Sequence, residues 1–360
     1  MLFSYPIEAL GQNWLNALAV DLMLAGMDSI DDGAEPAAWP DCLPEARRDI
    51  LAQRTGLRSK LASLFQRYSQ LSVPERHDVR TAILRQTDLP HVFNDNAPCP
   101  TIDSLALSIR QPVSALATYL FSQLSSIKEG GGFIRDIQYA AIYASKIRLC
   151  PFCGLNYFRA PGAPRHALDH LLPISKYPFA AADLRNLPPA CDECNTTYKR
   201  AIDILIGEDG LRRRCCDPYF GPTYRITLEG SEFFSGAEIG GFVLPRWNIN
   251  IVGQEPERAD TWNAVYRIKL RYTRDILNAD FLSWVSHYSK WFITENGRDH
   301  DAVAVAAQVP RYIEGVVQDG YADRAFLKAE AFRLLDRSTR DPEIGEDVRQ
   351  WLWGFVAYAS

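Results

Sequence analysis

The sequence has no apolar run as long as the roughly 18 residues that a membrane-spanning helix requires. The most apolar stretch near its start, residues 14–27, is interrupted by Asp21 and follows no lysine or arginine, which argues against a signal peptide. Low-complexity tracts and internal repeats are also lacking, and 47% of the 360 residues are hydrophobic, which is typical of folded globular proteins. We therefore expect a cytoplasmic protein of two or three domains with no membrane contact.

Positive charge is missing at the start of the chain and concentrated directly after it. Residues 1–46 contain eight acidic side chains and no lysine or arginine, whereas residues 47–88 contain nine basic and four acidic ones. We expect the acidic segment to shield the basic one. The net charge of −5 argues against a protein that coats nucleic acid over its whole surface, so any nucleic-acid site should be a local patch.

Hydrophobic spacing divides the chain into three parts. Residues 1–149 show mostly helical periods, including a helix that starts near Pro74 and others at about 113–127 and 134–147. Apolar residues alternate with polar ones near residues 224–228 and 247–251, which predicts a β-hairpin or small sheet. From Asp260 onward the helical period returns. We therefore expect a helical domain (1–149), a cysteine-containing domain (150–220) and a C-terminal region (221–360).

Four of the eight cysteines form two CxxC pairs, Cys150/Cys153 and Cys191/Cys194. Each pair can direct two thiolates toward one tetrahedral ion, so together they predict a closed structural zinc site with no open position for a substrate. Zinc would cross-link the ends of the intervening segment and couple metal binding to folding. The other cysteines show no second motif and are expected to be free thiols: Cys42, Cys99, Cys215 and Cys216.

Residue types suited to phosphodiester hydrolysis lie within and just after this segment. The Asp169 carboxylate and the Asn195 amide offer the oxygen ligands that a hard cation such as Mg²⁺ prefers. His170, neutral near pH 7, can take a proton from an attacking water. Each residue also has an ordinary interpretation: Asp169 as a turn or cap residue, Asn186 as the end of a strand, and Asn195 as the start of a helix.

Taken in order, Asp169-His170, Asn186 and Cys191-x-x-Cys194-Asn195-x-x-x-Lys199 resemble the HNH endonucleases, in the variant whose last letter is Asn and which carries a four-cysteine zinc. The resemblance covers residues 150 to about 203. It implies a ββα-metal finger in which a β-hairpin bears Asp169, His170 and Asn186 and a helix bears Asn195. It also implies that His170 is the general base, that Asp169 and Asn195 bind a catalytic Mg²⁺ or Mn²⁺, and that Asn186 supports the histidine loop. The fold class expected is thus α+β, mostly helical, with a central zinc-bound finger followed by a small hairpin or sheet.

Two further stretches refine the resemblance. Residues 168–178 resemble the Leu-Asp-His-x-x-Pro-Lys-x-x-Tyr-Pro form of HNH proteins in bacterial anti-phage systems such as the Septu type, with Ile174 where that form usually has Lys. Residues 217–220 resemble a His-Pro-Tyr-Phe-Asp element, with Asp217 in place of His and Gly221 in place of Asp. The resemblance implies a role in anti-phage defence and a regulatory partner such as an ATPase. A restriction enzyme or a mobile-element nuclease is the alternative role for such a protein.

Residues 146–214 carry eleven basic and seven acidic side chains, a local excess of four positive charges in an acidic protein. Such a patch can meet a phosphate backbone. Lys199 and Arg200 follow Asn195 on the predicted helix, and the alternative to a phosphate contact is that they lie on a solvated face of that helix. The candidate phosphate contacts are His166, Arg165, Lys176, Lys199 and Arg200.

The function expected is metal-dependent cleavage of DNA by an HNH endonuclease, and the resemblance implies the 5′-phosphate and 3′-hydroxyl ends that this family leaves. Two alternatives remain open. One is a catalytically inactive, zinc-stabilised module that binds nucleic acid or another protein. The other is a nuclease that cleaves RNA.

Overall fold

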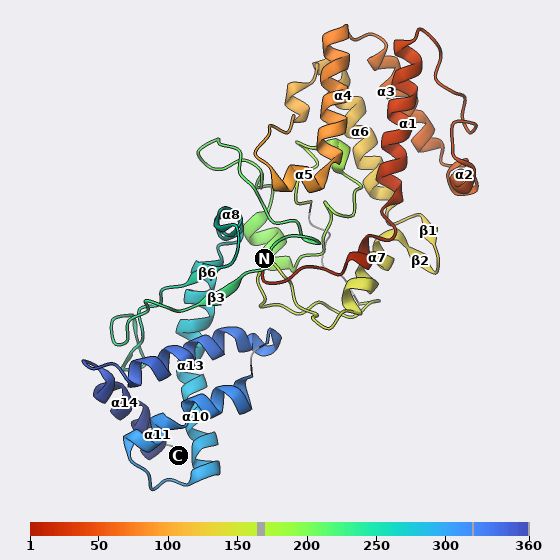
Figure 1. The fold of residues 1–360 in the computed structure, drawn as a ribbon. Helices are drawn as coiled ribbons and strands as arrows, with labels where there is room; N and C mark the ends of the chain where they lie inside the picture. The colour runs from red at the N-terminus through yellow and green to blue at the C-terminus, as the bar shows by residue number, and fades with distance from the viewer. Residues whose placement is uncertain (164–169, 319, 359–360) are drawn as a thin grey trace.

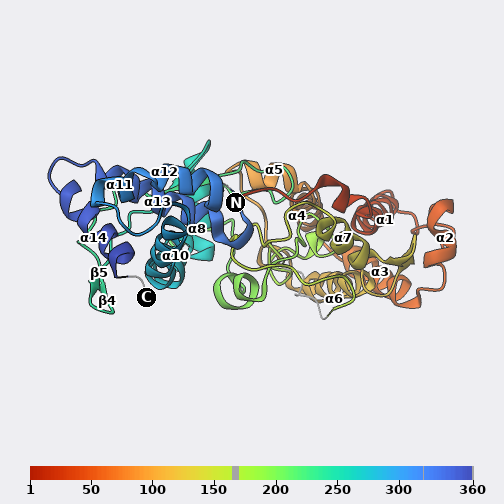
Figure 2. The ribbon, with the colours of Figure 1, turned by 90° about the horizontal axis from the view of Figure 1, so that it is seen from below.

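The structure is a computed structural model that describes residues 1–163, 170–318 and 320–358. The molecule is elongated, with N-terminal helices at one end, C-terminal helices at the other and a loop-rich segment between them (Figures 1 and 2). The α+β class is confirmed, since the described chain is mostly helical with small antiparallel sheets. None of the helices in the described ranges has the length and apolar character needed to cross a membrane.

The N-terminal part is a helical bundle, as its apolar spacing predicts. Ser72 and Glu75 form a capping box at the start of its fourth helix, with Pro74 in the first turn, which explains why that helix begins there. Its elements are η1 (Ile7–Leu10), α1 (Trp14–Asp31), α2 (Glu45–Leu51), α3 (Thr55–Tyr68), α4 (Val73–Thr87), α5 (Leu89–Asn94), η2 (Ile102–Ser104) and α6 (Leu107–Gln123).

The acidic start of the chain neutralises part of the basic segment, as expected. Asp31 on α1 lies 2.9 Å from Arg76 and 2.8 Å from Arg80, and Asp28 lies 2.7 Å from Arg80. Both arginines belong to α4, so these ion pairs join the first and fourth helices. The arginines are therefore occupied within the bundle, which weakens the case for this segment as a nucleic-acid surface.

A tight hairpin connects the bundle to the cysteine segment. Strands β1 (Lys128–Glu129) and β2 (Gly132–Phe133) pair across Gly130 and Gly131, whose φ angles of 56° and 111° favour glycine. Helix α7 (Ile134–Tyr143) follows and ends earlier than predicted. The chain then enters the first CxxC pair.

The predicted ββα finger is not seen in the described residues. Between Cys153 and Cys191 the described residues, 154–163 and 170–190, form no β-strand; they contain an isolated bridge from Tyr157 to Leu149 and the short 3₁₀ helix η3 (Pro178–Ala180). The helix predicted to bear Asn195 is present as the seven-residue π-helix η4 (Glu193–Lys199).

The C-terminal region combines small sheets and helices. Strand β3 (Arg225–Thr227) pairs antiparallel with β6 (Asn250–Val252), with Ile226 opposite Ile251, which confirms the sheet predicted from alternation. The remaining elements are β4 (Glu238–Ile239), β5 (Phe242–Val243), α8 (Pro256–Tyr266), α9 (Ile268–Arg271), η5 (Tyr272–Leu277), α10 (Asn278–Asn296), α11 (Ala302–Ala307), α12 (Val309–Tyr312), η6 (Ile313–Val317), η7 (Ala322–Arg324), α13 (Ala325–Thr339) and α14 (Gly345–Ala357).

Two hydrophobic cores hold the molecule together, and the cysteine segment contributes to both. The N-terminal core contains apolar side chains of α1, α3, α4 and α6 together with Phe179, Leu184 and Leu187. The second core contains the four cysteines of the CxxC pairs and the C-terminal helices. The segment between the cysteine pairs therefore packs against both ends of the molecule.

Candidate functional site

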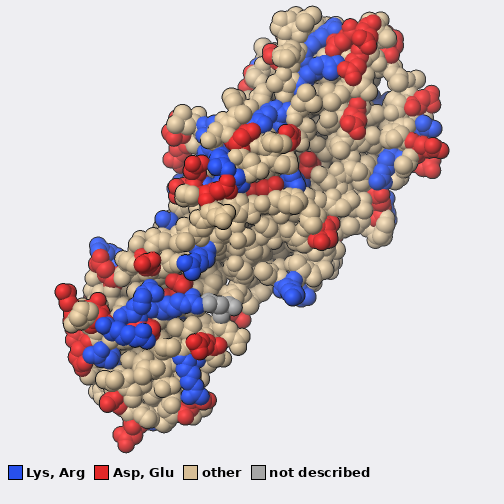
Figure 3. All heavy atoms as spheres, in the orientation of Figure 1, with Lys and Arg blue, Asp and Glu red and all other residues tan. Residues whose placement is uncertain are grey.

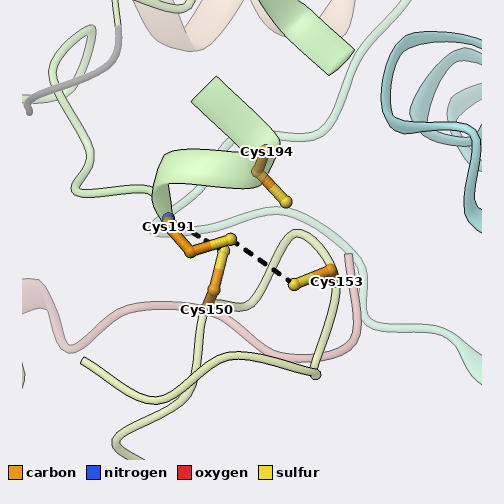
Figure 4. Close-up of side chains that lie close together, drawn as sticks. All are labelled: Cys150, Cys153, Cys191 and Cys194. Atoms are coloured by element: carbon orange, nitrogen blue, oxygen red, sulfur yellow. Dashed lines mark hydrogen bonds between the residues drawn. The ribbon is translucent and has the colours of Figure 1, made fainter. Parts of the chain in front are cut away.

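The four cysteines of the two CxxC pairs meet in one buried cluster, here called the cysteine cluster. Their Sγ atoms all lie within 4.8 Å of one another, and those of Cys153 and Cys191 are 3.8 Å apart. Figure 4 shows Cys150 and Cys153 on one loop, facing Cys191 and Cys194 at the start of η4. A tetrahedron of sulfurs about 2.3 Å from zinc has edges of about 3.8 Å. The donor set and its spacing therefore fit a zinc ion.

Hydrogen-bond donors surround the sulfurs of the cysteine cluster. The amide of Leu155 lies 3.4 Å from Cys153 Sγ, and the Asn156 side-chain amide lies 3.4 Å from Cys191 Sγ. Such donors stabilise thiolates and tune a bound metal. The Tyr272 hydroxyl donates to the Cys153 carbonyl at 2.7 Å, so the first CxxC loop is anchored to the C-terminal region.

Arg271 completes the surroundings of the cysteine cluster, and the sequence did not point to it. Its side chain is fully buried, with Nη1 3.3 Å from Cys194 Sγ and Nη2 2.7 Å from a carboxylate oxygen of Glu193. Burial opposes the charged form, but Cys194 and Cys153 outweigh burial and raise the pKa of Arg271 above its usual value. The guanidinium is thus a fixed positive charge beside a site that carries two negative charges when four thiolates bind Zn²⁺.

Replacing Arg271 by methionine should speed zinc loss and lower the free energy of unfolding by roughly 3 kcal/mol. The reason is that the negative charge of the buried cysteine cluster loses the guanidinium that lies beside Cys194. Zinc transfer to a chromogenic chelator and thermal unfolding measure the two effects. Arg271→Lys should give a zinc-loss rate and a stability between those of wild type and Arg271→Met. Lysine keeps the positive charge but cannot donate to Cys194 and Glu193 at the same time, as the planar guanidinium does. Arg274→Met, which removes an exposed arginine three residues away, is the matched control. Equal zinc retention in Arg271→Met and this control would show that Arg271 does not help to retain the metal.

His170, the predicted base, lies in a confined position. Its ring centroid is 4.5 Å from that of Phe121 on α6, and Nε2 lies 3.1 Å from the Ala181 carbonyl oxygen. Because a carbonyl only accepts, Nε2 carries the proton and Nδ1 keeps a lone pair. Burial lowers the pKa of His170 to about 4; the bond to Ala181 opposes this shift, and the charge of Lys199 adds to it. The ring is therefore neutral at pH 7.

Asn186 fixes the backbone that follows His170. The Asn186 side chain is fully buried; its oxygen accepts from the Leu172 amide at 2.7 Å, and its nitrogen donates to the carbonyls of Leu172 and Ala180 at 3.2 and 3.1 Å. The Leu171 backbone N–H donates to the Asn186 backbone carbonyl at 3.0 Å. Although residues 170–190 form no strands, these bonds hold the two segments together as the expected hairpin would.

The helix η4 brings Asn195 and Lys199 to the same region. Lys199 is 1% exposed, and its Nζ donates to the His170 carbonyl at 2.5 Å. This burial corrects the expectation that Lys199 contacts phosphate: its ammonium group joins η4 to the histidine backbone. Asn195 is partly exposed, and its backbone N–H donates to the Cys191 backbone carbonyl at 3.0 Å, so the cysteine cluster sets the position of its backbone.

The other candidate phosphate contacts differ in availability. Arg200 is exposed and has a positive φ of 48°, directly after η4. The Nζ of Lys176 lies 3.2 Å from the buried Asp203 carboxylate, which also accepts from the Tyr177 hydroxyl at 2.9 Å. Three of the predicted site residues lie outside the described residues: Arg165, His166 and Asp169.

The element at residues 217–220 has a structural role. Buried Asp217 accepts from the Tyr219 amide at 2.8 Å, and the Tyr219 hydroxyl accepts from the buried Gln138 side chain at 2.9 Å. Gln138 also donates to the Leu184 and Leu187 carbonyls at 3.0 and 3.1 Å. The element therefore supports the segment that contains Asn186.

Comparison with known proteins identifies no relative. The chain matches no protein-family model, no curated protein and no solved structure.

Proposed function

We propose that the protein is a metal-dependent endonuclease of the HNH type that hydrolyses DNA. The observation that carries the proposal is the framework around His170. Lys199 bonds the histidine carbonyl from the helix that bears Asn195, and Asn186 bonds the backbone two residues beyond the histidine. Three elements of the sequence motif, His170, Asn186 and the helix η4, thus belong to one hydrogen-bonded unit.

In this proposal His170 accepts a proton from an attacking water through Nδ1. This nitrogen has no hydrogen-bond partner among the described residues, while Nε2 is held by the Ala181 carbonyl. Contact with Phe121 limits rotation of the ring. A neutral ring that is fixed in orientation can accept a proton at pH 7, and its pKa of about 4 makes it a weaker base than an ordinary histidine.

The catalytic cation would be held by Asn195 together with Asp169, the second of which lies outside the described residues. When bound, Mg²⁺ or Mn²⁺ would offset negative charge on the scissile phosphate. The cysteine cluster has no open coordination position and serves structure alone. Zinc at the cysteine cluster and a weaker, exchangeable cation near Asn195 thus have separate roles.

Cleavage of supercoiled plasmid by the purified, zinc-loaded protein tests the proposal. We expect nicked or linear DNA with Mg²⁺ or Mn²⁺ and intact DNA when these ions are omitted, with zinc content measured in each sample. Ends should carry 5′-phosphate and 3′-hydroxyl groups. Binding of DNA without cleavage under any cation would instead favour the inactive zinc-stabilised module, and cleavage of RNA alone would change the substrate.

The place of this activity in the cell is proposed from the sequence resemblance of residues 168–178. It supports anti-phage defence in the cytoplasm, with an ATPase as regulatory partner. An acidic nuclease with a net charge of −5 gains from a partner that delivers DNA.

A further inference from the structure

A groove with arginine side chains runs between strand β3 and helix α13, far along the chain from the HNH-like motif. It has a volume of about 770 Å³, and three arginines contribute to its lining: Arg225, Arg333 and Arg337. We call it the basic groove. Figure 3 shows lysine and arginine side chains gathered over α13 on the same face. Residues 324–340 contain five basic and two acidic side chains, so this patch contrasts with the acidic protein as a whole.

Two of the arginines are available to a ligand. Arg225 and Arg337 are exposed, and no hydrogen-bond or ion-pair partner of either side chain is found in the described part of the chain. Arg333 lies 2.8 Å from Glu330, whose second oxygen accepts from the Leu228 amide at 3.2 Å. Glu330 is therefore occupied in joining α13 to the end of β3. Glu229 is the other acidic residue in the described lining of the groove.

The basic groove adjoins the cysteine cluster. Leu2 lines the groove, and its amide donates to the Pro151 carbonyl, inside the first CxxC pair, at 3.2 Å. The Tyr321 hydroxyl donates to the Leu2 carbonyl at 2.9 Å. Tyr321 also lines a second cavity of about 700 Å³. Three more cationic side chains line this second cavity: Lys146, Arg148 and Lys328.

We propose that the basic groove binds the phosphodiester backbone of DNA and so presents the duplex to the site at His170. This inference rests on the proposed function. Six cationic side chains line the two adjoining cavities against three acidic ones among the described residues, Glu229, Glu330 and Asp323. This excess suits an extended polyanion, because a single phosphate would occupy a small part of the space. Arg333 and Arg337 are four residues apart, and therefore lie on one face of α13, about 6 Å apart along its axis.

The test measures DNA binding separately from cleavage. The double variant Arg225→Glu/Arg337→Glu is compared with wild type by fluorescence anisotropy of labelled duplex DNA over a range of KCl, with Mg²⁺ and Mn²⁺ omitted. We expect binding at least about tenfold weaker and a salt dependence reduced by about two units of slope, one for each lost phosphate contact. A double control, Arg298→Glu/Lys269→Glu, changes the same charge at exposed positions that line neither cavity and should bind like wild type.

The outcomes separate this inference from the proposed function. If the groove variant and the control bind DNA equally well, the proposal that the basic groove binds DNA is wrong, even if wild type cleaves plasmid. Absence of duplex binding by wild type overturns it as well. If inorganic tripolyphosphate displaces DNA at micromolar concentration, the groove is a compact anion site and the backbone assignment fails. Weakened binding by the groove variant with no cleavage by wild type under any cation supports the groove and overturns the nuclease.

Discussion

Replacing Cys191 by serine should remove the metal from the cysteine cluster and unfold the middle of the molecule. Cys191 Sγ lies 3.8 Å from Cys153 Sγ, and its side chain is buried with the other three cysteines. Loss of one thiolate from a closed zinc site weakens metal binding severely, and because metal binding is coupled to folding, the variant should lose roughly 5 kcal/mol or more of stability. Zinc content by mass spectrometry or plasma emission, together with thermal unfolding, measures both effects.

The position of the lost structure is also expected. The cysteine cluster belongs to the core shared with the C-terminal helices, where Trp262 on α8 donates to the Phe152 carbonyl at 2.8 Å. Hydrogen exchange should therefore accelerate in α8, whereas α3 and α6, in the separate N-terminal core, should stay protected. Cys42→Ser, at a partly buried cysteine outside the cluster, is the control. A Cys191→Ser protein that retains one zinc per chain would show that the cluster is not the metal site.

The fold was predictable where local patterns determine structure. The capping box at Ser72 and Glu75 and the alternation around Ile226 and Ile251 depend on neighbouring residues, and the structure has the predicted elements there. The predicted hairpin between the cysteine pairs is not seen in the described residues, which form no strands there. The segment is held instead by hydrogen bonds of the Asn186 side chain and by packing of Phe179 and Leu184 into the N-terminal core. These contacts are made between residues apart in the chain, so the local spacing of residue types does not predict them.

The site was predictable to a similar degree. The spacing of the cysteines predicted their cluster because four thiols in two CxxC pairs have few other uses. Sequence patterns do not indicate the role of Arg271, because it lies 77 residues beyond Cys194 in the chain, on a helix whose apolar spacing predicts a core. Sequence alone favours a phosphate contact for Lys199 because basic residues are mostly exposed. In the structure Lys199 lies at the end of η4, where its ammonium group is buried and donates to the His170 carbonyl.

Replacing His170 by alanine should reduce the rate of DNA cleavage by roughly 100- to 10,000-fold, the usual contribution of a general base. The variant removes the ring that contacts Phe121 and the Ala181 carbonyl but keeps the backbone carbonyl to which Lys199 donates. Zinc content should therefore be unchanged, and so should binding to labelled duplex DNA, since neither the cysteine cluster nor the basic groove includes His170.

His91→Ala, which removes an exposed histidine paired with Asp88, is the matched control and should cleave like wild type. The decisive comparison is cleavage at equal zinc content and at DNA concentrations that saturate binding, so that a lower rate reports chemistry rather than affinity. Cleavage by His170→Ala at the wild-type rate would exclude His170 as the base. A His170→Ala protein that also loses its zinc would instead point to a structural role, because the hydrogen bonds that connect η4, Asn186 and the histidine backbone would then depend on the ring.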